Sequence, residues 1–168
     1  SEKNLLGTGD VLPDLKLSAP KTSAHKEYLG LTGDSSFQIP DIKTDVVIVE
    51  IFSMYCPHCQ KEAPSLNKLY HMIENHPTAK GKIKLIGIGA GNDIFEVDYV
   101  KKKFEVVFPL FDDEDYIIHK ACGKPGTPFF VVVMGKDDGT YKVVHTQLGG
   151  FESPEAFLKT VLNKSGLK

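Results

Sequence analysis

The sequence predicts an α/β fold, in which helices cover a central β-sheet. From residue 81 onward, short apolar segments rich in β-branched residues alternate with segments of helical periodicity. Residues 45–52 read Asp-Val-Val-Ile-Val-Glu-Ile-Phe, and so continuous an apolar run is typical of a central strand buried on both faces. With 168 residues, of which 41% are hydrophobic, the chain has enough apolar material for one globular domain, 1–168.

Four strands are predicted from residue 45 onward. Besides 45–52, the segments 82–88 and 129–134 have the composition of buried strands. The turn-rich sequence Gly-Lys-Asp-Asp-Gly at 135–139 separates 129–134 from 141–147. We therefore expect the last two strands to pair as an antiparallel hairpin.

Helices are predicted in the gaps between these strands. The last helix follows Ser-Pro-Glu at 153–155, where serine is a capping residue and proline suits the first helical position. In the first helix, Leu66, Leu69 and Ile73 recur at helical spacing and are expected to face the sheet. Pro64 is expected to kink that helix. The predicted helices span residues 57–75, 93–104, 114–122 and 153–164.

The first part of the chain, 1–44, is interpreted as an N-terminal β extension to a core of residues 45–168. A short strand is predicted at 14–17. The segments 27–31 and 36–39 flank a Gly-Asp turn and are predicted to form a β-hairpin.

Composition and charge argue against several classes of function. All 20 basic residues are lysines and the net charge is −2, so the guanidinium groups that read phosphates and guanine edges are absent and no nucleic-acid partner is expected. The longest apolar runs are far shorter than the roughly 20 residues that cross a bilayer. No second Cys-x-x-Cys completes a zinc site, so no metal is expected. The glycines at 87–91 lack the G-x-G-x-x-G spacing of a nucleotide site.

The motif Cys56-Pro57-His58-Cys59 carries the chemistry that we expect of this chain. It lies where a buried strand gives way to a helix. The free N–H groups and the positive dipole end of that helix favour the thiolate form of Cys56, which is therefore the predicted nucleophile. Cys59 lies one helical turn on and is the predicted resolving cysteine. His58 is expected to stabilise the thiolate further, and Pro57 supplies a preset helical φ.

These residues resemble the thioredoxin-like thiol-disulfide oxidoreductases. The segment 50–59, with its Cys-Pro-His-Cys, resembles the active site of the DsbA-type oxidants, whereas 59–64 and 108–128 resemble the TlpA/ResA branch. The resemblance implies a thioredoxin-like fold, with a central mixed β-sheet flanked by helices, an N-terminal β extension and a βα insertion.

The resemblance also implies roles for residues outside the Cys-x-x-Cys. Glu50 matches the buried acid beneath the active site, and Glu62 matches the glutamate that ResA-like members place after their motif. Either carboxylate could relay the proton of the resolving thiol, and we favour Glu50. Pro128 matches the cis-proline that faces the disulfide, and the preceding Thr127 would present its backbone to an extended substrate. Tyr55 replaces the tryptophan usual before the first cysteine.

Taken together, these features predict an enzyme that exchanges disulfides with protein substrates through the Cys56–Cys59 couple and needs no other cofactor. The resemblance implies a monomer in an extracytoplasmic setting, served by a membrane redox partner, with any signal or anchor absent from this chain. Cys122 is outside the motif and is interpreted as a small buried hydrophobe, with a regulatory or intermolecular disulfide as the alternative.

Three other functions share features with this sequence. A peroxiredoxin would need a threonine three residues before Cys56, where Ser53 stands. A copper-binding protein of the same fold would use thiolates and a histidine as soft ligands, but its relatives space their cysteines by three residues rather than two. An accessory role in cytochrome maturation stays open.

Overall fold

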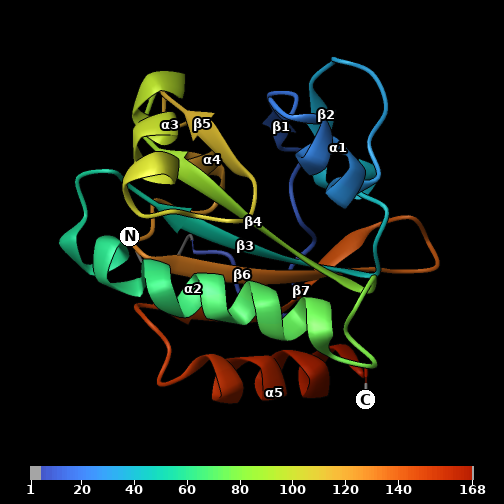
Figure 1. The fold of residues 1–168 in the computed structure, drawn as a ribbon. Helices are drawn as coiled ribbons and strands as arrows, with labels where there is room; N and C mark the ends of the chain where they lie inside the picture. Colours follow the sequence, from blue (N-terminus) through green and yellow to red (C-terminus); the bar gives the residue numbers. More distant parts are fainter. Residues whose placement is uncertain (1–4, 168) are drawn as a thin grey trace.

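The computed structural model describes residues 5–167, and its centre is a five-stranded mixed sheet (Figure 1). The strand order is β5-β4-β3-β6-β7. The pairs β3/β4 and β4/β5 are parallel, whereas β3/β6 and β6/β7 are antiparallel. The five strands are β3 (Val46–Phe52), β4 (Ile83–Ala90), β5 (Leu110–Asp113), β6 (Phe129–Gly135) and β7 (Tyr141–Leu148).

Helices lie on both faces of this sheet. The longest, α2 (Pro57–Asn75), runs beside α5 (Pro154–Ser165) on one face, and α1 (Ser23–Leu29) and α4 (Ile117–Ala121) lie on the opposite side (Figure 1). The helix α3 (Ile94–Lys103) packs against the outer strand β5. The predicted α/β class and the thioredoxin-like arrangement of a mixed sheet between helices are confirmed.

The central strand β3 is buried on both faces, as predicted. Because successive side chains of a strand point to opposite faces, alternate residues enter two different core clusters. Val47, Val49 and Ile51 pack in the cluster that contains Leu29 of α1 and Ile118 of α4. Val46, Ile48 and Phe52 pack in the cluster that contains α2 and α5. Glu50 has the parity of this second set, so its carboxyl group points toward the helix that carries Cys59.

The main helices begin and end close to the predicted residues, because the sequence places capping residues at their ends. α2 spans the predicted 57–75 and continues through Pro64. Asp93 and Glu96 form a reciprocal capping box at the start of α3. The Ser153 side chain accepts a hydrogen bond from the Ala156 N–H at the start of α5.

The hairpin predicted at 27–31 and 36–39 is wrong, and the N-terminal extension is not purely β. Residues 23–29 form α1 instead, because Thr22 caps the first turn by accepting from the His25 N–H and Gly30 ends the helix in the left-handed region. Two two-residue strands, β1 (Lys16–Leu17) and β2 (Phe37–Gln38), pair antiparallel with each other. A 3-10 turn at Ile39–Asp41 follows β2.

Two further differences concern the segment between α3 and β6. The strand β5 was not among the predicted strands, and α4 begins at Ile117 rather than at residue 114. Residues 114–116 form a turn because the Asp113 carboxylate accepts from the N–H groups of Ile118 and His119, which delays the helix start.

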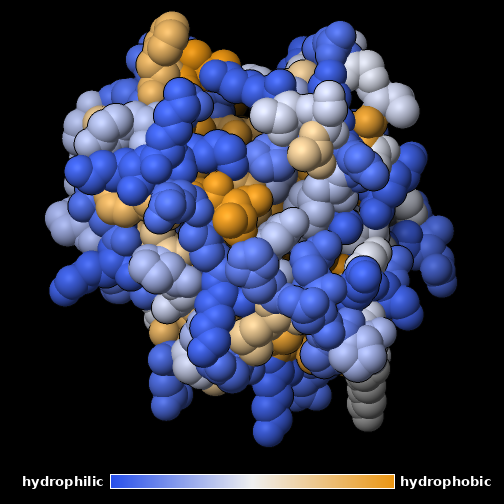
Figure 2. Space-filling model, in the orientation of Figure 1, coloured by the Kyte–Doolittle hydropathy of each residue, from blue (hydrophilic) through white to orange (hydrophobic). Residues whose placement is uncertain are grey.

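The surface of the face shown in Figure 2 is mostly hydrophilic, with hydrophobic side chains exposed near its centre. None of the helices within residues 5–167 is both long and apolar enough to span a membrane.

Candidate active site

Cys56 occupies the cap position at the N-terminus of α2. Its sulfur accepts a hydrogen bond from the Cys59 backbone N–H at 3.1 Å, and Pro57 follows at the first helical position, where no N–H is needed. The preceding loop is held by the Met54 N–H, which donates to the Asn92 side-chain oxygen at 2.8 Å. The half-buried Cys56 sulfur is thus placed against the positive end of a 19-residue helix.

The opposite wall of the site is the segment before β6. The Cys56 thiol donates to the Thr127 carbonyl oxygen across 3.5 Å, although the two residues are 71 positions apart in the chain. The Thr127–Pro128 peptide bond is cis, as the resemblance implies. Thr127 is half-buried, Pro128 is buried and Pro57 is exposed. The backbone of Thr127 therefore lies directly beside the sulfur that faces solvent.

Cys59 is the inner member of the pair and has 7% of its surface exposed. Both cysteines are free thiols in the structure. Burial raises the pKa of the Cys59 thiol well above its ordinary value, and its hydrogen bond with Cys56 and the nearby negative charge of Glu50 act in the same direction. The inner cysteine is consequently held as a neutral thiol.

Glu50 is a buried carboxyl group beneath the two cysteines. Only 4% of its surface is exposed. Burial raises its pKa to about 8, and the negative charges of Glu62 and Cys56 contribute to the same shift. A carboxyl group with a pKa near neutrality can both accept and release a proton.

Glu62, one turn beyond Cys59 on α2, points its carboxylate at the backbone that follows β7. A Cβ atom at Gly150 would lie 2.4 Å from Glu62 Oε2, so the carboxylate occupies the space left by that missing side chain. Its other oxygen, Oε1, is buried and has no hydrogen-bond partner within residues 5–167. Glu50 and Glu62 are close enough to interact electrostatically, so the structure brings both predicted acids to the same place.

A family model described as Redoxin matches residues 8–162. The chain belongs to the Redoxin family. Its curated relatives include the thiol-disulfide oxidoreductase ResA of Geobacillus thermodenitrificans, 22% identical over 138 residues, which are 81% of this chain and 70% of that protein. The ResA of Geobacillus kaustophilus is 21% identical over 71% of this chain, which spans 59% of that relative. The implied resemblance to the ResA branch is confirmed.

Solved structures show the same fold. The thioredoxin domain of a thiol-disulfide oxidoreductase from Bacteroides vulgatus superposes with a TM-score of 0.67 at 19% identity, covering 93% of this chain and 99% of that domain.

Two predicted residues of this Redoxin-family site, Tyr55 and His58, are exposed to solvent. Tyr55 is 69% exposed, and its hydroxyl donates a hydrogen bond to the Glu96 carboxylate on α3. His58 is exposed, and its ring makes no hydrogen bond with any residue that the structure describes. No hydrogen bond therefore joins the His58 ring to the Cys56 sulfur, and a role for this histidine stays a prediction.

Cys122 lies apart from the pair. It has 2% of its surface exposed, in the core cluster on the other face of the sheet from Cys59. Burial, with the nearby negative charge of Asp113, raises its pKa to about 12. The predicted burial of Cys122 among apolar side chains is confirmed, and its lack of a redox role stays a prediction.

Sequence reasoning missed two residues that shape the site, Asn92 and Gly150. Asn92 is fully buried and holds the loop before Cys56, while its Nδ2 has no partner in the described part of the chain. An asparagine between a strand and a capped helix gives no local sign of that role.

Residues 5–167 contain no group of three or more His, Cys, Asp or Glu side chains arranged to hold a metal ion.

Proposed function

We propose that the chain is a thiol-disulfide oxidoreductase that exchanges disulfides with protein substrates through Cys56 and Cys59. The proposal rests on the position of the half-buried Cys56 sulfur, which lies 3.1 Å from the Cys59 backbone nitrogen at the start of α2. The second thiol, that of Cys59, is buried beside it. The names of the curated ResA relatives support the same activity.

The first step is attack by the outer cysteine. The Cys56 thiolate, stabilised by the helix N-terminus, attacks one sulfur of a substrate disulfide. A mixed disulfide forms between Cys56 and that sulfur, and the substrate's second sulfur leaves as a thiolate and takes a proton from water. The exposed Tyr55 and the Thr127 backbone flank this point and would hold an extended substrate segment in the manner of an added strand. Pro57 is exposed next to Cys56, whereas Pro128 is buried and is joined to Thr127 by the cis peptide bond.

The second step is resolution by the inner cysteine. The Glu50 carboxylate accepts the proton of the Cys59 thiol, and the resulting thiolate attacks the Cys56 sulfur. The Cys56–Cys59 disulfide forms, the bond from Cys56 to the substrate breaks, and the substrate sulfur leaves and is protonated. The substrate disulfide gains two electrons and the enzyme dithiol loses two. Run in reverse, the same steps oxidise a substrate dithiol. Glu62 would modulate Glu50 through its negative charge.

We propose that the Cys56–Cys59 couple is more oxidising than thioredoxin, while the net direction of exchange depends on the partner that supplies or removes electrons. The reduced form alone carries a thiolate at the positive end of α2, so its stabilisation makes the disulfide a stronger oxidant. We further propose that the protein acts as a monomer outside the cytoplasm, as the ResA resemblance implies. A membrane redox partner would then return the Cys56–Cys59 pair to its starting redox state after each exchange.

A turnover assay tests the proposed activity. A reduced peptide with two cysteines is mixed with oxidised glutathione, and peptide disulfide formation is followed with and without the protein at catalytic concentration. We expect the wild type and Cys122→Ala to accelerate the reaction equally, because Cys122 is buried away from the site. Rates no higher than those without protein would reject the proposal.

A further inference from the structure

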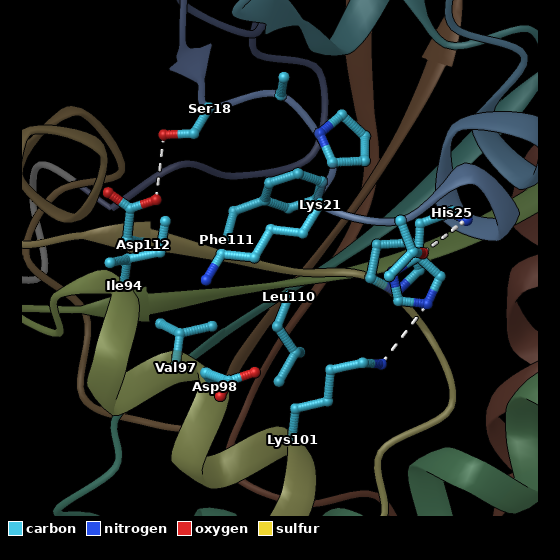
Figure 3. Close-up of a pocket in the computed structure, with 14 residues that line it drawn as sticks. Ser18, Lys21, His25, Ile94, Val97, Asp98, Lys101, Leu110, Phe111 and Asp112 are labelled. Atoms are coloured by element: carbon cyan, nitrogen blue, oxygen red, sulfur yellow. Dashed lines mark hydrogen bonds between the residues drawn. The ribbon is translucent and has the colours of Figure 1, made fainter. Parts of the chain in front are cut away.

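A cavity of about 140 Å³ lies between the segment 18–25 and the unit formed by α3 and β5 (Figure 3). None of the residues that line it belongs to the proposed active site. Val97, Leu110 and Phe111 give it an apolar side, and the polar groups of Lys21, His25 and Lys101 approach it from α3 and from the N-terminal segment (Figure 3).

Lys101 brings a half-buried ammonium group to this cavity without a counter-ion. Its Nζ donates to the Val106 carbonyl oxygen at 3.0 Å and lies 3.4 Å from His25 Nε2. Burial and the Lys101 charge lower the pKa of His25 to about 4, so the ring is neutral at pH 7 and accepts from Lys101. An ammonium group has three N–H donors, and these two neutral acceptors leave one uncommitted.

The remaining charged groups around the cavity are two aspartates and a second lysine, Lys21. Asp98 pairs with Lys102 at 2.8 Å and only partly offsets the Lys101 charge, while Asp112 accepts from the Ser18 hydroxyl at 3.0 Å. Lys21 and Lys101 form no ion pair with any residue in 5–167. A ligand that supplied one negative charge would therefore find an unmatched cation, and half-buried charges without partners are costly.

We propose that this cavity binds a small carboxylate that carries a single ring or a short branched apolar group. The carboxylate accepts from Lys101, and the apolar group packs on Val97, Leu110 and Phe111. The cavity volume of about 140 Å³ suits a ligand with a single ring, because an apolar cavity of roughly 150 Å³ holds one benzene molecule. The inference does not rest on the proposed function, since none of its residues takes part in disulfide exchange.

Matched ligands of equal size test the proposal on the full wild-type chain. Benzoate, benzyl alcohol and benzylamine are titrated separately while the backbone amide signals of the protein are followed by NMR. We expect benzoate to shift the signals of Val97, Lys101 and Leu110 saturably, with a Kd at least tenfold lower than that of either other ligand. Equal affinities, tighter binding of benzylamine, or shifts confined to other parts of the chain would overturn it.

A pair of variants on one helix tests the role of the cation. Lys101→Met removes the charge but keeps the apolar stem, and Lys103→Met makes the same change at an exposed position that does not line the cavity. We expect a benzoate Kd at least tenfold higher for Lys101→Met and unchanged for Lys103→Met. Unchanged binding in both variants would contradict the assignment, and the wild-type ligand comparison stands even where a variant fails to fold.

Discussion

Replacing Cys59 by alanine is expected to trap covalent complexes between Cys56 and substrate proteins. The exposed side of the pair belongs to Cys56, whereas Cys59 is buried and held as a neutral thiol. Without Cys59 the mixed disulfide has no internal thiol to resolve it, so it persists. Non-reducing electrophoresis followed by mass spectrometry would show the complexes and the cysteine that carries them.

Three controls make the assignment specific. The Cys56→Ala variant should form no complexes and should lose all catalysed exchange, because the remaining thiols are buried. The double variant Cys59→Ala/Cys122→Ala should trap as well as Cys59→Ala alone. If trapping instead required Cys56→Ala, the order of the two cysteines would be reversed.

Changing Glu50 to glutamine is expected to slow exchange and to stabilise the protein at high pH. Loss of the proton acceptor should reduce the rate of mixed-disulfide resolution by about a hundredfold. The stability effect has a definite sign. The pKa of Glu50 is about 8 in the folded chain against an ordinary 4.5, so the unfolded chain gives up this proton first as the pH rises. The wild type therefore loses stability between pH 4.5 and 8, and the loss is complete above that range.

Melting curves at two pH values check this expectation. At pH 9 the Glu50→Gln variant should melt higher than the wild type by about 5 °C or more, and at pH 4 the two should coincide, since both side chains are then neutral. Glu114→Gln, at an exposed position, serves as the matched control and should follow the wild type at both pH values. A difference that is largest at pH 4 would refute a buried, protonated Glu50.

The elements with strong local signals could be predicted from the sequence, and those that depend on distant partners could not. Residues 46–52 and 57–75 carry their own evidence in a continuous apolar run and in a capped helical pattern. The strand β5 has only four residues, two of them aspartates, and exists because it pairs with β4. In α1 the cap signals of Thr22 and Gly30 were present, but the short Gly-Asp turn beyond them favoured a hairpin.

The same division holds within the candidate site. The order of Cys56 and Cys59 at a helix start is a local property, and it could be derived from spacing. The place of Glu50 follows from strand alternation only once α2 is known to cover that face of β3. The fit of Glu62 against Gly150 joins residues 88 positions apart through the absence of a side chain, which no local pattern reveals.

The reduction potential of the Cys56–Cys59 couple reports directly on the proposed stabilisation of the Cys56 thiolate. The protein is equilibrated in glutathione buffers of graded ratio, the thiols are blocked, and mass spectrometry locates the disulfide in each sample. We expect one two-electron transition, confined to Cys56 and Cys59, with a potential clearly above that of thioredoxin, about −270 mV. A potential at or below that value would contradict the proposed stabilisation of the Cys56 thiolate, and a disulfide that includes Cys122 would contradict the proposed site.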